Sequence, residues 1–238
     1  MYSWLIGNLL LGSARRAYPQ HCAGRRSYVS SRAGASRLIV AGAAAADPPG
    51  RQDASQRSLV HHGLVPLFSF EGLEPVVSPT AWIAPTATLV GDVHVEDEAS
   101  VWYGAVLRAD FGPIFVRRGA NIQDGSVLHG DRDPATEVGA GATVGHLCVV
   151  HGARIGAEAL IGNGATVLDG AVIGGRALVA AGATVPPGMN VPDGMLAAGV
   201  PARIVGELTS GARTWVETNP AAYRALAGRY AAGVRPVP

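Results

Sequence analysis

The chain has 238 residues, of which 48% are hydrophobic and 16% charged, and its formal net charge is +1. No basic stripe with interleaved aromatic residues is present, which argues against a nucleic-acid partner. No apolar run approaches the roughly 20 residues that a membrane-spanning helix needs. The two cysteines, Cys22 and Cys148, are too few for a disulfide framework. We therefore expect a reducing compartment, the cytoplasm, and no membrane partner.

Residues 1–60 differ in composition from the rest of the chain. Ala, Ser and Gly dominate, several arginines occur, and no acidic residue precedes Asp47. This composition is typical of an organellar transit peptide, which would make the location mitochondrial. The alternative is sequence upstream of the true start codon, and we favour it because all 19 basic residues are arginine. Either way, we expect a disordered and dispensable extension.

A six-residue repeat dominates the middle of the chain. The repeat is too long for the period of a helix or a strand, but it fits a coil of three short strands joined by tight corners. Stacking such coils buries a column of aliphatic side chains. The sequence therefore predicts an all-β fold, a left-handed parallel β-helix, over residues 65–205. The repeating aliphatic residues are Ile83, Leu89, Val95, Val101, Val138, Val144, Ile155, Ile161, Val167, Ile173, Val179 and Val185.

The last part of the chain changes character. Residues 207–232 carry apolar side chains at helical spacings, including Trp215, Tyr223 and Tyr230. Asn219 followed by Pro220 is typical of a helix start, because Asn caps helices and Pro suits the first helical position. We predict a C-terminal helix that packs along the outside of the β-helix.

Three histidines share one phase of the repeat. His129, His146 and His151 each follow a valine by two residues. The 17-residue spacing from His129 to His146 is close to one coil, whereas His146 and His151 lie one strand apart and project from different faces. A neighbour around a threefold axis, in a homotrimer, would supply the missing ligand. Three imidazoles with an open position suit catalytic Zn²⁺, and Fe²⁺ or Co²⁺ also accept them. The alternative is three unrelated surface histidines.

A second polar cluster precedes these histidines. Arg108 and Asp110 lie on one side of a predicted strand, as do Asn121 and Gln123 on another. Arg108 and Asp110 are suited to pair across a subunit seam, and Gln123 to orient a metal-bound water. The alternative is that Arg108, Asp110 and Asp124 form only a salt-bridge network at an interface.

These motifs together resemble the gamma-class carbonic anhydrases over about residues 66–230. The resemblance implies a homotrimer with a metal at each interface, bound by His129 and His151 of one subunit and His146 of its neighbour. The motifs that carry it are Trp102–Gly104, Leu107–Asp110, Asn121–His129 and Val144–Gly152.

The resemblance also implies an activity and further site residues. Metal-bound hydroxide would attack CO2 and release bicarbonate, which makes the protein a carbonate dehydratase, a lyase. Gln123 would contact the metal-bound solvent, and Arg108 and Asp110 would pair between subunits, with Asp124 nearby. Phe111 stands where well-studied members carry a proton-transferring glutamate.

Two other classes of function fit the repeat. Left-handed β-helices include acyl-CoA-dependent acyltransferases, which use a histidine as general base, and Gly199–Ala202 resembles the segment near CoA in those enzymes. A thioesterase would act on the same kind of carbonyl. The last alternative is a catalytically inactive, metal-binding structural trimer.

Overall fold

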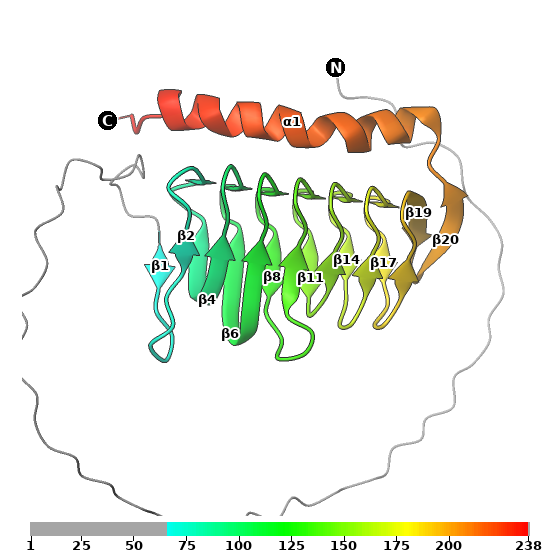
Figure 1. Ribbon diagram of the computed structural model, residues 1–238, viewed down its shortest axis with the longest axis horizontal. Coiled ribbons are helices and arrows are strands. Elements are labelled where there is room, and N and C mark those ends of the chain that lie inside the picture. The colour runs from blue at the N-terminus through cyan, green and yellow to red at the C-terminus, as the bar shows by residue number, and fades with distance from the viewer. Residues whose placement is uncertain (1–65, 238) are drawn as a thin grey trace, which may run out of the picture. The chain divides into compact units, whose positions relative to one another are not determined.

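The computed structural model describes residues 66–237. Short parallel strands follow one another around a solenoid, and one helix, α1 (Ser210–Gly233), runs along its side (Figure 1). The predicted parallel solenoid with a C-terminal helix is confirmed. The predicted extension over residues 1–60 lies outside the described residues, so its order and its boundary stay predictions.

The solenoid has three faces, which the strand pairing defines. The first, here called the histidine face, contains β1 (Leu67–Phe68), the first halves of β4 (Thr88–Val95) and β6 (Val106–Val116), β8 (Val127–His129), β11 (Val149–His151), β14 (Thr166–Val167) and β17 (Thr184–Val185). The second contains β2 (Val76–Val77), the second halves of β4 and β6, β9 (Thr136–Val138), β12 (Arg154–Ile155), β15 (Val172–Ile173) and β18 (Asn190–Val191).

The third face lies under the helix. It contains β3 (Trp82–Ile83), β5 (Ser100–Val101), β7 (Asn121–Ile122), β10 (Thr143–Val144), β13 (Leu160–Ile161), β16 (Leu178–Val179) and β19 (Met195–Gly199), with β20 (Ala202–Glu207) antiparallel at its end. Seven of these eight strands are parallel and each belongs to one turn. The described solenoid therefore has about seven turns.

The repeating aliphatic residues form the core. Eleven of the twelve repeat positions are buried, from Leu89 to Val185, and Ile83 is partly buried against the core. Burying one such side chain stabilises a fold by about 1.5–3 kcal/mol. Alternate strand residues face outward, so each two- or three-residue strand contributes both to the core and to a surface.

Glycine occupies most of the tight corners, where φ is positive. One column of corners, here called the Leu147 column, joins the helix-covered face to the histidine face. From Gly125 onward, the backbone N–H of each corner residue donates a hydrogen bond to a carbonyl in the corner of the preceding turn. Gly104, Gly125, Gly164 and Gly182 have φ of +68° to +69°, and the middle corner is Leu147 with φ +57°. A leucine in this conformation costs on the order of 1 kcal/mol or more.

Helix α1 (Ser210–Gly233) lies close to the predicted bounds, residues 207–232, but its N-cap is not Asn219. Thr209 is the N-cap, because its side chain accepts a hydrogen bond from the Ala212 N–H, and Pro220 lies inside the helix. The prediction of a helix start at Asn219-Pro220 was wrong. The Asn219 side chain instead donates to Thr143 on β10, 2.9 Å away, so this residue attaches the helix to the solenoid. No helix within residues 66–237 is long and apolar enough to cross a membrane.

An aromatic cluster anchors the far end of α1 to the first turns of the solenoid. Tyr230 lies 5.3 Å from Trp82 and 5.0 Å from Trp102 between ring centroids, both edge-on. Such pairs contribute about 0.5–1.5 kcal/mol beyond their buried area. The helix is therefore held along the third face near its middle, at Asn219, and near its C-terminal end, at Tyr230.

Candidate functional site

His129 and His151 lie side by side on the histidine face. They end β8 and β11, and the strand register pairs them directly. The spacing between them is 22 residues, four more than an 18-residue coil, because the loop after His129 lengthens this turn. The 17-residue spacing from His129 to His146, although close to one coil, does not bring these two residues together. The structure instead places His129 beside His151, the two histidines that the resemblance assigned to one subunit.

Four side chains form one hydrogen-bonded row across this face. His129 Nδ1 lies 2.8 Å from His151 Nε2, and His129 Nε2 lies 2.8 Å from an Asp110 oxygen. At the other end, His151 Nδ1 contacts the carboxylate of Asp169. The row is Asp110–His129–His151–Asp169, and it engages both nitrogens of both imidazoles. A separation of 2.8 Å is that of a direct hydrogen bond.

Arg108 completes the row on β6. Its guanidinium pairs with Asp110 of the same chain, so the pair that was predicted between subunits forms within one protomer. Burial works to raise the pKa of Asp110, but hydrogen bonds from His129 and Arg108 outweigh it, so the pKa lies below its ordinary value. Hydrogen bonds to a charged carboxylate favour the charged form.

The pH dependence of stability follows from this lowered pKa. Because the folded-state pKa of Asp110 is below the unfolded value, its stabilisation is present above the unfolded pKa and lost as pH falls through the folded pKa. We expect Asp110→Asn to be less stable than the wild type near neutral pH, with the difference shrinking as the solution is acidified below pH 4 or so. Urea denaturation at a series of pH values measures this. A constant difference down to the acid limit would contradict it.

His146 stands apart from this row, in the corner before β11. Its Nδ1 lies 3.0 Å from Asp124 Oδ2, and its side chain is 42% exposed. Asn163 accepts a hydrogen bond from its backbone N–H, which fixes the corner. Among the described residues nothing hydrogen-bonds the other ring nitrogen, Nε2. This Asp–His pair therefore presents one oriented imidazole with an available nitrogen.

Gln123 belongs to a different network. Its amide donates to Asn121 Oδ1 at 3.0 Å, and Asn121 donates to Thr143 Oγ1 at 2.8 Å. Asn219 of α1 donates to the same hydroxyl. These buried amides connect the helix to the strand that precedes Asp124. The predicted neighbours Asn121 and Gln123 do meet on one side of their strand, but the structure describes no contact from Gln123 to a histidine.

Asp169 was missed at the sequence level. It follows His151 by 18 residues, one regular coil, and that spacing was the available signal. Asp131, His151 and Asp169 each place one donor atom within 4.8 Å of the other two, which is a set of residues able to hold a metal ion. Gly152 between them has φ +51°, and a Cβ there would meet the Asp169 carboxylate at 2.8 Å.

Cys148 is buried beneath the corner that carries His146. Burial raises the pKa of its thiol to about 11, so the reactive thiolate is scarce at neutral pH. In a Cys22→Ser chain we expect Cys148 to resist a thiol reagent at pH 8 and to react fully in denaturant. Absorbance of the released chromophore measures this. Rapid labelling of the folded protein would contradict the burial of this residue.

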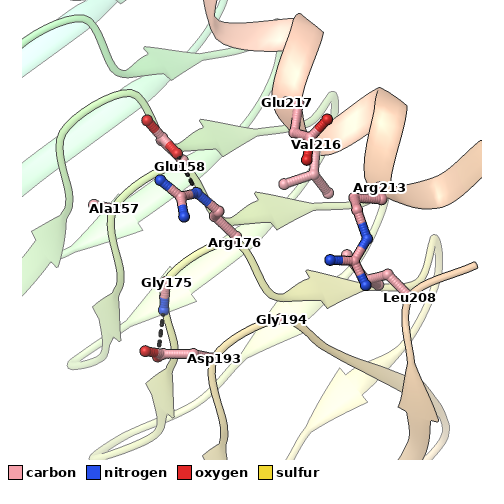
Figure 2. A pocket seen from close by; sticks show the side chains of 10 residues that line it. All are labelled: Ala157, Glu158, Gly175, Arg176, Asp193, Gly194, Leu208, Arg213, Val216 and Glu217. Carbon is pink, nitrogen blue, oxygen red and sulfur yellow. Dashed lines mark hydrogen bonds and ion pairs between the residues drawn. The ribbon is translucent and has the colours of Figure 1, made fainter. Parts of the chain in front are cut away.

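A separate groove lies between α1 and the corners of the last turns. It has a volume of about 440 Å³ and is lined by charged residues, among them Arg176, Arg213 and Glu217 (Figure 2). Glu158 pairs with Arg176 at 2.6 Å, and Asp193 accepts from the Gly175 N–H. None of the three predicted histidines lines this groove.

Curated relatives identify the family of the chain. The carnitine operon protein CaiE of Escherichia coli K12 is 43% identical over 164 residues, which cover 68% of this chain and 83% of CaiE. CaiE of Shigella flexneri matches to the same extent. The chain belongs to the CaiE family. No protein-family model matches the chain.

Two solved structures are similar to the chain over most of their own length. A proposed acetyltransferase from Bacillus cereus has a TM-score of 0.68 and 34% identity, covering 70% of this chain and 96% of its own. A hexapeptide transferase family protein from Anaplasma phagocytophilum has a TM-score of 0.67 and 37% identity, covering 69% and 98%. These similarities support the predicted hexapeptide-repeat, left-handed β-helix.

The relatives overturn the predicted activity. The prediction of reversible CO2 hydration by a gamma-class carbonic anhydrase was wrong. The chain is instead similar to CaiE and to proteins named for acetyl or hexapeptide transfer. The classification as a lyase and the substrates CO2 and bicarbonate are wrong with it. The cofactor call of Zn²⁺, with Fe²⁺ or Co²⁺ as substitutes, was wrong as well, because these relatives are named for acetyl or hexapeptide transfer and not for a metal-dependent reaction. The roles of His129, His146 and His151 as ligands stay a prediction.

Proposed function

We propose that this protein transfers an acyl group from an acyl-CoA thioester to an amine or hydroxyl acceptor. Two relatives of known structure support this class of reaction, since each is at least 34% identical and covers at least 69% of the chain. The observation that carries the proposal is the pairing of His146 with Asp124, which leaves Nε2 available and the ring oriented. A histidine held by a carboxylate is the usual general base for activating a nucleophile.

His146 is preferred over the other two imidazoles because of hydrogen bonding. Both ring nitrogens of His129 and of His151 already have partners in the row, so neither ring offers a nitrogen to an acceptor molecule without breaking a contact. His146 needs no such rearrangement. In this proposal Asp124 orients the base, whereas Arg108 and Asp110 hold His129 in place. Gln123 supports the strand that leads to Asp124.

The proposed step conserves protons and electrons. His146 Nε2 accepts the proton of the acceptor O–H or N–H while the acceptor atom bonds to the thioester carbonyl carbon. The C–S bond then breaks, and the CoA sulfur leaves with the electron pair. The protonated His146 returns its proton to that sulfur. The products are the acylated acceptor and free CoA.

We also propose that the active protein is a homotrimer, with the histidine face at the contact between subunits. Outward-facing valines on β8 and β11, Val127 and Val149, lie exposed beside His129 and His151. Apolar side chains in a row on a sheet favour a contact with another surface. Because the named relatives are bacterial, we propose a cytoplasmic location.

Calorimetric titration of the full chain with acetyl-CoA tests this proposal without knowledge of the acceptor. We expect saturable binding, and release of free CoA thiol that accelerates when a panel of primary amines and alcohols is added. Desulfo-CoA serves as the matched ligand, because it should bind without turnover. Absence of binding at millimolar acetyl-CoA would contradict the proposed function.

A further inference from the structure

Leu147 is the one non-glycine residue among five aligned corners. The backbone N–H of each corner residue from Gly125 onward donates to the preceding turn, which fixes the alignment. Four of these corners are glycines with positive φ, and Leu147 adopts φ +57° in the same place. A leucine is strained there, whereas a glycine is not. Something other than the local backbone must therefore favour leucine at this position.

The protomer itself gives no such compensation. The Leu147 side chain is 70% exposed, so folding buries little of its apolar surface. Its Cδ2 lies 2.6 Å from the position that a Cβ on Gly125 would occupy, so it lies over the neighbouring corner rather than in the core. Residues held in a strained backbone conformation cluster at active sites, ligand clamps and switch regions.

Leu147 continues the apolar surface of the histidine face. Val149 follows it on β11, and Val127 pairs with Val149 in the adjacent turn. All three are exposed. They form a strip that ends at His129 and His151, because alternate residues of a strand face the same side.

Charged groups of both signs surround this strip. Arg108 and His146 lie on its flanks, and so do the carboxylates of Asp124 and Asp169, all of them partly exposed. An apolar centre with a polar rim is the usual composition of a protein interface. A surface with positive charges alone would favour nucleic acid or an anionic membrane. A rim with charges of both signs is complementary to the same rim on another copy of the chain.

We infer that Leu147 is the interface anchor: it inserts into a second copy of this chain, and that burial offsets its backbone strain. The inference rests on the proposed assembly and names the residue that drives it. Its consequence is a pair of effects with opposite signs. Removing the side chain weakens association and relieves the strain of the isolated protomer.

The test is Leu147→Gly in the full chain, measured by sedimentation equilibrium and by thermal unfolding over a wide range of protein concentration. The wild type should associate, and its Tm should rise with concentration. The variant should associate at least tenfold more weakly, with a Tm that no longer depends on concentration. At the highest dilution its Tm should exceed that of the wild type by up to about 2–4 °C.

Glu71→Gly is the matched control. Glu71 also has positive φ, +49°, and lies in the hairpin after β1, away from the strip. It should raise Tm at every concentration and leave association unchanged. Association of Leu147→Gly equal to the wild type, a wild type that stays monomeric, or a lower Tm of the diluted variant would each overturn the inference. Loss of association without acetyl-CoA turnover in the wild type would support the anchor and contradict only the proposed acyl transfer.

Discussion

Replacing His146 by alanine is expected to lower acetyl-CoA turnover by at least about a hundredfold, because a positioned general base contributes roughly 10²–10⁴ to the rate. The binding of acetyl-CoA should change little, since the imidazole acts on the acceptor proton. Initial rates of thiol release, together with calorimetric affinity, separate these effects. Asp124→Asn should give a smaller loss, because the imidazole remains but is held less firmly.

His94→Ala is the control for this substitution. His94 is also partly exposed and also pairs with an aspartate, Asp92, at 2.8 Å, but it lies on the second face of the solenoid. Its replacement should leave turnover within a factor of about two of the wild type. Equal losses for His94→Ala and His146→Ala would contradict the assignment of the base to His146.

Ile173→Ala is expected to lower the free energy of unfolding by about 2–5 kcal/mol. Ile173 is 1% exposed and faces the core from β15. Its neighbour Val172 is 42% exposed on the second face, so Val172→Ala should cost less than about 1 kcal/mol. The two residues are adjacent in one strand but face opposite sides, so comparing the two variants tests the strand register directly.

Urea denaturation of the two variants measures this difference. Similar losses for both substitutions would mean that the inward and outward positions of the hexapeptide are assigned wrongly. The free-energy changes should come with unchanged denaturant dependence, since neither substitution alters the extent of the solenoid.

The solenoid was predictable because an aliphatic residue recurs at every sixth position and marks where each strand faces the core. Leu89, Val144, Ile161 and Val179 all point into the core at the positions that the repeat indicated. A regular repeat places each strand relative to its neighbours, so errors do not accumulate along it. The start of α1 was harder to predict. Thr209 and Asn219 are both plausible caps, and only packing against Thr143 decides between them.

The arrangement of the site was less predictable because it depends on an irregular turn. The loop after His129 adds four residues, so His129 stacks on His151 and not on His146. The spacing of 17 residues between His129 and His146 is close to one coil and gave no sign of this loop. Asp169 followed the regular 18-residue spacing and could have been found. Where a turn is lengthened, the six-residue spacing no longer tells which residues of neighbouring turns lie side by side.

The activity could not be read from the histidines. Imidazoles serve as metal ligands and as general bases, and both uses place them on a surface with carboxylates nearby. The choice of metal chemistry followed from a count of three phased histidines. In the structure, His129 and His151 are hydrogen-bonded to each other, and His146 pairs with Asp124. The segment Gly199–Ala202, which resembles the segment near CoA in acyltransferases, lies at the β19–β20 turn.

A crystal structure of the assembled protein with bound acetyl-CoA tests the proposed acyl transfer most directly. The account predicts the thioester beside His146, where an acceptor atom about 3 Å from Nε2 could reach the carbonyl carbon. The CoA sulfur should lie on the same side, so that the imidazole can return its proton. Acetyl-CoA bound away from His146, for instance in the groove beneath α1, would contradict His146 as the base and with it the proposed function.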